Sequence, residues 1–97
     1  MAQVAYAPRA VEQIERAIEQ LRADKPEVAV ATAVAFLSGF ENLAAHPLVG
    51  RRVEEDLREL VVSYGATGYI ALYRFVVQRD EVRVLALRHQ REIGYLP

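Results

Sequence analysis

The sequence predicts an α+β fold in which a short N-terminal strand precedes an antiparallel helical hairpin and a three-stranded antiparallel meander. Three observations predict this fold. Apolar residues recur at helical spacing over residues 8–23, and a long alanine-rich apolar segment follows over residues 27–46. Runs rich in β-branched and aromatic residues, separated by short connections, then fill residues 57–87. A chain of 97 residues is long enough for one domain with one core, so we expect residues 1–97 to form a single domain.

The N-terminal part is predicted to form an edge strand and the first helix. Residues 3–6 (Gln-Val-Ala-Tyr) have the composition of a short strand. Pro8 suits the first turn of a helix, where the missing amide proton has no helical partner. The apolar side chains of this amphipathic helix are Val11, Ile14, Ile18 and Leu21. Asp24 can cap the next helix, and Pro26 can occupy its first turn. A link this short between two helices favours an antiparallel hairpin.

The second predicted helix, over residues 27–46, is apolar on more than one face. Its longest apolar region, residues 28–37, is interrupted by Thr32 and is too short to span a bilayer, so we expect a soluble protein without a membrane partner. A helix with so wide an apolar surface is buried on two sides or binds another protein. The helix should end before Pro47. One stripe of this helix contains Val30, Ala33, Val34, Leu37, Phe40 and Ala44.

The C-terminal half is predicted to form the sheet. Residues 48–56 are polar and have the composition of a turn, whereas three later segments have that of strands: 57–64, 69–77 and 81–87. Gly65 and Gly68 indicate a turn between the first two strands, and residues 78–80 a hairpin loop before the third. Two short connections in succession imply antiparallel pairing. Tyr69 and Tyr73 lie on one strand face and are expected to pack in or beside the core.

Composition excludes several classes of function. The chain has no cysteine, which rules out disulfides, thiolate nucleophiles and zinc–thiolate sites. The start of the chain lacks a basic region followed by an apolar stretch, so we expect no secretory signal and a cytoplasmic location. A net charge of −1 argues against binding nucleic acid by charge alone. Of the 12 basic residues only Lys25 is a lysine, and arginine suits bidentate contacts to carboxylate or phosphate.

The end of the third strand carries the strongest candidate site. His46 and His89 are the only histidines, and a metal site is not expected because zinc takes three or four ligands at recognisable spacing. Cleavage of a phosphodiester without metal needs a base, an acid and cations for the developing charge. The residue types for this chemistry are present in Glu59, Arg74, Arg88, His89, Arg91 and Tyr95. The alternative is that the charged residues within the strands form cross-strand ion pairs on a solvated sheet face; these are Arg58, Glu59, Arg74 and Arg83.

Four motifs, in this order and spacing, resemble the RelE/ParE family of toxins from about residue 6 to residue 95. They are Leu43-x-x-His-Pro47-x-x-Gly50, Leu57-Arg-Glu-Leu60, Gly68-Tyr69-Ile-Ala-Leu-Tyr73 and Val84-Leu-Ala-Leu-Arg-His-Gln-Arg91. The resemblance implies the growth-inhibiting toxin of a bacterial type II toxin–antitoxin system. It also implies a hetero-oligomer in which the tail of a small antitoxin wraps the hairpin and sheet. We therefore predict an antitoxin-binding surface at Val30, Val34 and Leu37.

Two activities occur in this family. One branch cuts messenger RNA on the ribosome, and the other poisons DNA gyrase without hydrolysis; neither implies a cofactor. An ungapped alignment places the nuclease lysines at Val61 and Ser63 and one nuclease arginine at Ile70, so these functional groups are missing. The final arginine position holds His89, and only Tyr95 matches outright.

This pattern slightly favours gyrase as the target. The alternative is a nuclease whose catalytic set is Glu59, Arg74, His89 and Tyr95, a combination similar to the glutamate, arginine and histidine used by some members. Arg88 and Arg91 would contact the substrate or target. A third interpretation is a non-toxic module that only binds the antitoxin.

Overall fold

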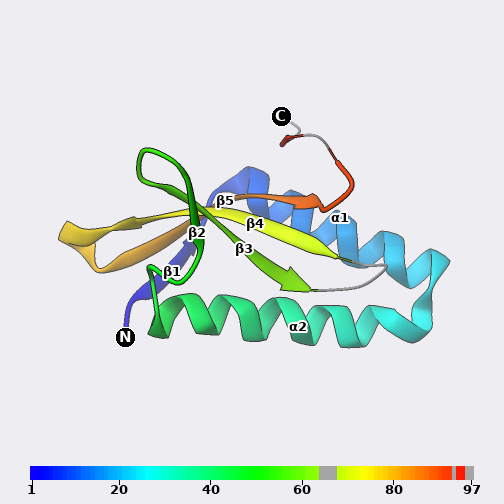
Figure 1. Ribbon diagram of the computed structural model, residues 1–97. Helices are drawn as coiled ribbons and strands as arrows, with labels where there is room; N and C mark the ends of the chain where they lie inside the picture. Colours follow the sequence, from blue (N-terminus) through cyan, green and yellow to red (C-terminus); the bar gives the residue numbers. More distant parts are fainter. Residues whose placement is uncertain (64–67, 93, 96–97) are drawn as a thin grey trace.

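The computed structural model describes residues 1–63, 68–92 and 94–95 and has the predicted α+β architecture. A five-stranded sheet is covered on one face by two helices, and the segment after the last strand lies on its other side (Figure 1). The strand order is β1-β5-β4-β3-β2. β1 pairs parallel with β5, and the remaining neighbours are antiparallel. The elements are β1 Gln3–Tyr6, α1 Pro8–Asp24, α2 Pro26–Ala45, β2 Arg51–Glu54, β3 Leu57–Ser63, β4 Tyr69–Val76 and β5 Glu81–His89.

The helical hairpin and its short link are confirmed, with one correction at the junction. Asp24 is the last residue of α1, and Lys25 occupies the N-cap position of α2 without a side-chain hydrogen bond. Asp24 therefore does not cap α2, because the link between the helices is only one residue long. Pro26 opens α2 as expected.

The predicted turn over residues 48–56 is wrong in part, because β2 forms within it. β2 pairs with β3, with Arg51 opposite Glu59 and a register shift between Arg52 and Glu54. All four β2 residues are exposed, so this strand shows no alternation of apolar and polar residues to predict it. Residues 64–67, which contain most of the turn expected before β4, lie outside the described residues.

The core lies between the helices and one face of the sheet. Phe36, Phe40 and Leu43 of α2 pack with Tyr73 of β4 and other buried residues. α2 is long and apolar enough to cross a membrane by length and composition, so the expectation that its apolar part is too short was wrong. One such helix is also typical of a protein core, and α2 packs against β3 and α1.

A β-bulge in β5 decides which of its side chains face the helices. Leu72 pairs with Ala86 but Tyr73 pairs with Val84, so Leu85 is an extra residue. Val84 before the bulge and Leu87 after it both lie in the core. The extra residue therefore turns Arg88 to the open face of the sheet, away from the helices.

Tyr73 ties the loop before β2 to the core. Its side chain is fully buried, and its hydroxyl accepts a hydrogen bond of 2.8 Å from the Gly50 amide. A side chain at residue 50 would clash, since a Cβ there would lie 2.6 Å from the Tyr73 ring. This contact fixes where β2 begins.

We expect Tyr73→Phe to lower the free energy of unfolding by about 1–2 kcal/mol, because the buried Gly50 amide loses its partner. Tyr6→Phe is the matched control, since Tyr6 is 40% exposed and should change stability by less than about 0.5 kcal/mol. Denaturant unfolding measures both variants. Equal effects of the two substitutions would contradict a structural role for the Tyr73 hydroxyl.

Candidate functional site

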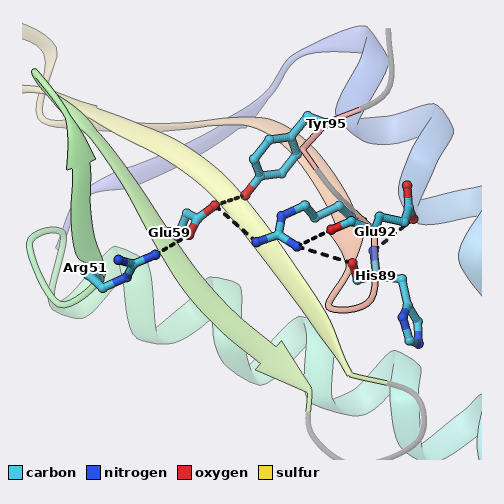
Figure 2. Close-up of polar contacts among 6 residues, drawn as sticks. Arg51, Glu59, His89, Glu92 and Tyr95 are labelled. Atoms are coloured by element: carbon cyan, nitrogen blue, oxygen red, sulfur yellow. Dashed lines mark hydrogen bonds and ion pairs between the residues drawn. The ribbon is translucent and has the colours of Figure 1, made fainter.

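The open face of the sheet carries a polar cluster centred on Glu59 of β3. We call Arg51, Glu59, Arg88 and Tyr95 the Glu59 cluster. Tyr95 donates a hydrogen bond of 2.6 Å to Glu59 Oε2, and Arg51 donates one of 3.0 Å to Oε1 (Figure 2). A guanidinium nitrogen of Arg88 lies 3.7 Å from Oε2. Both carboxylate oxygens are therefore engaged, and the Glu59 side chain is only 12% exposed.

Arg88 connects this carboxylate to the C-terminal turn. Its guanidinium donates to the carbonyl oxygens of Glu92 at 2.9 Å and His89 at 3.4 Å. Its central carbon lies 5.3 Å from the centre of the Tyr95 ring, in cation–π range. Gly94, with φ of 76°, has the left-handed backbone that glycine adopts without strain. Arg88 thus holds the segment that presents Tyr95 to Glu59.

The cluster moves two pKa values away from neutrality. Burial alone would raise the pKa of Glu59, but the hydrogen bonds from Tyr95 and Arg51 and the charges of Arg88 and Arg51 outweigh it, so this pKa falls below its ordinary value. Burial raises the pKa of Tyr95 far above its ordinary value, and the hydrogen bond to the Glu59 carboxylate raises it further. The pair is therefore held as a carboxylate and a neutral phenol.

His89 is separated from this cluster although it adjoins Arg88 in sequence. Its ring packs edge-on against Tyr69 at 5.2 Å between centroids, on the side of the helices. Its Nδ1 accepts a hydrogen bond of 3.1 Å from the Arg91 amide, and Glu92 Oε1 accepts one from the His89 amide. In Figure 2 the His89 ring points away from Glu59 and Tyr95. It lines a cavity of about 290 Å³ between α1 and the end of β5.

The other predicted residues lie elsewhere. Arg74 is 3.8 Å from Asp56 and lines a groove beside β2 rather than the Glu59 cluster. Arg91 is exposed in the turn after β5. Of the predicted nuclease residues, Glu59 and Tyr95 are therefore in contact, whereas Arg74 and His89 lie outside the Glu59 cluster. The predicted target contact Arg88 joins the cluster instead.

The predicted antitoxin-binding residues form a continuous apolar surface on α2. Val30, Val34 and Leu37 are 74%, 56% and 60% exposed. With Ile18 of α1 they line a shallow apolar depression of about 290 Å³ along the hairpin. The opposite side of α2 faces the core, so this surface is what the hairpin leaves open.

Arg51 is the cluster member that the sequence analysis missed. It lies in the segment expected to be a turn, and only the pairing of β2 with β3 brings it opposite Glu59. The weak signal available was two residues of opposite charge, eight positions apart, around a polar turn. Within residues 1–63, 68–92 and 94–95, no group of three acidic or histidine side chains is placed to hold a metal ion.

The helical hairpin on one face of a mainly antiparallel sheet is the fold of small bacterial toxins of known structure. RelE in the intact Escherichia coli RelBE toxin–antitoxin complex superposes with a TM-score of 0.60 at 13% identity, covering 95% of this chain and all of that chain. The toxin–antitoxin complex RelBE2 of Mycobacterium tuberculosis gives a TM-score of 0.59 at 23% identity, covering 94% of this chain and 93% of the other.

Sequence comparison identifies the family. Residues 4–94 match the family described as ParE toxin of type II toxin–antitoxin system, parDE. Toxin RelE3 of Caulobacter vibrioides is 37% identical over 92 residues, covering 95% of this chain and 98% of the relative. The chain belongs to the RelE/ParE family of type II toxin–antitoxin toxins.

The lowered pKa of Glu59 predicts a pH-dependent contribution to stability. A carboxyl with a lower pKa in the folded state stabilises the fold above its unfolded pKa and loses that contribution as the pH falls. At neutral pH we expect Glu59→Gln to cost about 1 kcal/mol or more. The difference in free energy of unfolding between this variant and the parent protein should disappear as the pH falls from roughly 5 towards 3.

Denaturant unfolding at several pH values measures this difference. Glu41→Gln, at an exposed position of α2, is the control for a change of net charge alone. A loss of unfolding free energy in Glu59→Gln that stays constant with pH would show that the carboxylate charge does not stabilise the cluster.

Proposed function

We propose that this protein is a growth-inhibiting toxin, neutralised by a cognate antitoxin, that acts in the cytoplasm on DNA gyrase without hydrolysing its target. The family supplies the first part, since its members are toxins of type II toxin–antitoxin systems. The preference for gyrase over messenger RNA rests on the state of Glu59. Its carboxylate is saturated by Arg51, Arg88 and Tyr95 and is poorly suited to proton transfer.

Metal-free RNA cleavage works best with an acid and a base whose pKa values lie near the working pH. In the Glu59 cluster the pKa of the carboxyl is lowered and that of the phenol is raised, so Glu59 is a weak base and Tyr95 a weak acid. His89, whose ordinary pKa would suit this role, lies towards the helices. Contacts of this kind are typical of a structural role, and here they hold the C-terminal segment against β3.

The pattern of missing residues supports the same preference. The family positions for the nuclease lysines hold Val61 and Ser63, so cations for a phosphorane are fewer on this face. A net charge of −1 also fits a protein target better than RNA on a ribosome.

The second candidate function is a ribosome-dependent messenger RNA endonuclease. The observation that favours it is the convergence of Glu59, Arg88 and Tyr95 on one open face, since these groups suit base, phosphate contact and stacking or proton donation. It would require Glu59 to leave Arg51 and Tyr95 when substrate binds, which would raise the pKa of Glu59.

An antitoxin is the expected partner, and the α2 surface is where we place it. An apolar surface formed by Val30, Val34 and Leu37 on a chain of this size is typical of a protein-binding site. The Escherichia coli toxin of the same fold is found in a complex with its antitoxin. A hetero-oligomer that covers α2 would remove this surface from water.

The function is tested by comparing two targets with the same purified protein. We expect intact messenger RNA in an in vitro translation reaction mapped by primer extension. We also expect a trapped gyrase–DNA cleavage complex in a supercoiling reaction. Glu59→Gln should retain gyrase poisoning within about tenfold, whereas a nuclease that uses Glu59 as a base would lose roughly 10²–10⁴-fold.

Two outcomes would contradict the proposal. Ribosome-dependent cuts in the message that vanish with Glu59→Gln or His89→Ala would make the protein an endonuclease. Normal growth on induction of this protein, with or without a co-expressed antitoxin, would make it a non-toxic antitoxin-binding module.

We expect Val34→Asp to weaken antitoxin binding by about tenfold or more, because it places a charge in the centre of the α2 surface. Val34 is more than half exposed, so the substitution should leave the melting temperature nearly unchanged. Val49→Asp, at a valine 49% exposed before β2, is the control. Hydrogen exchange on the complex should show added protection over α2. Unchanged exchange there, or equal effects of the two substitutions, would place the antitoxin elsewhere.

A further inference from the structure

A second open surface lies beside β2 and has no part in the Glu59 cluster. It is a groove of about 680 Å³, which we call the arginine groove. Adjacent residues of β2 serve the two sites: Arg51 contacts Glu59, whereas Arg52 lines the groove. Its lining includes Leu48, Arg52, Arg58, Arg74, Phe75 and Val77.

Three guanidinium groups and two carboxylates, those of Glu55 and Asp56, line this groove, so its lining carries a formal charge of +1. Arg58 donates to the carbonyl oxygens of Leu48 at 3.1 Å and Gly50 at 2.9 Å. Arg52 donates to the Glu55 carbonyl oxygen. Arg74 lies 3.8 Å from Asp56, and its buried Nε has no hydrogen-bond partner among the described residues. Among the residues that the structure describes, no carboxylate oxygen lies closer than 3.8 Å to a guanidinium nitrogen of these three arginines.

The groove also has an apolar wall. Leu48 and Val77 are 59% and 70% exposed, and the half-buried Phe75 also belongs to the lining. Isolated exposed apolar side chains are ordinary, but here they share one groove with the three arginines. The surface thus offers both cationic hydrogen-bond donors and apolar contact.

We propose that the arginine groove binds an acidic segment of a partner protein in which carboxylates are interleaved with apolar side chains. Guanidinium groups pair with carboxylates in bidentate geometry, and the apolar wall takes the intervening side chains. Glu55 and Asp56 also line the groove. They would repel a nucleic acid, whose phosphates follow at every nucleotide, whereas a peptide can place neutral residues opposite them.

The inference does not depend on gyrase as the target, because the groove shares no residue with the Glu59 cluster. It also gives a role to Arg74, which the sequence suggested as catalytic and the fold places here. Failure of one proposal would leave the other standing.

The test is fluorescence anisotropy with the full-length protein and a labelled ten-residue peptide of alternating Glu and Leu. We expect binding that weakens with salt, and a loss of about tenfold or more in the Arg52→Gln/Arg74→Gln variant, since charge-assisted hydrogen bonds are lost. Arg79→Gln/Arg83→Gln is the control with the same change of charge, at residues outside the groove lining. Melting temperatures verify that each variant is folded.

Three kinds of result would overturn the proposal. The first is equal binding by the two variants, which would indicate only non-specific charge attraction. The second is equal binding of a matched peptide with Gln in place of Glu, or no binding of the acidic peptide at millimolar protein. The third is tighter binding of a ten-nucleotide oligouridine that is lost in the groove variant, which would make the groove a nucleic-acid site.

Discussion

The alternation of side chains along β5 is the constraint on which the rest of this structure depends. β5 lies between β1 and β4, so every second side chain must enter the core beneath the helices. The extra residue Leu85 shifts this alternation, so that Val84 and Leu87 both face the core. Without it, Arg88 would point at the helices with a buried, unpaired charge, which is costly. The bulge is therefore the reason that Glu59 has a cationic partner on the open face.

Glu59 shows how a residue suited to catalysis becomes structural. A carboxylate on an open sheet face is a plausible base only if its pKa stays near or above its ordinary value. Here burial destabilises the charged form, but the hydrogen bonds from Tyr95 and Arg51 and the charges of Arg88 and Arg51 together outweigh it and lower the pKa. The same contacts hold the C-terminal segment in place. Contacts that stabilise the Glu59 cluster therefore make Glu59 a weaker base.

The sequence predicts those parts of the fold that depend on local patterns. The periodic residues of α1, the prolines at both helix starts and the aromatic strands are local signals, and the corresponding elements are confirmed. β2 and the bulge in β5 depend on pairing between strands. For β2 the sequence carries only the weak signal of Arg51 and Glu59 on either side of a polar turn, and for the bulge it carries no local signal. The uniform hydrophobicity of α2 likewise does not decide which side is buried: Phe36 and Leu43 enter the core, whereas Val30 and Val34 remain exposed. Arg74 and His89 have suitable chemistry, but only the strand register shows that they face different sites.

β2 links the two polar sites of the molecule because it is an edge strand with no buried side chain. Its position depends on pairing with β3 and on contacts made by Arg51 on one side and Arg52 on the other. The Tyr73–Gly50 hydrogen bond fixes only its start. An edge strand held in this way is among the least stable parts of a sheet, since few apolar contacts oppose its opening. Any ligand that orders β2 would therefore also hold Arg51 against Glu59. This would favour the paired Glu59 carboxylate over the free carboxylate that a nuclease requires.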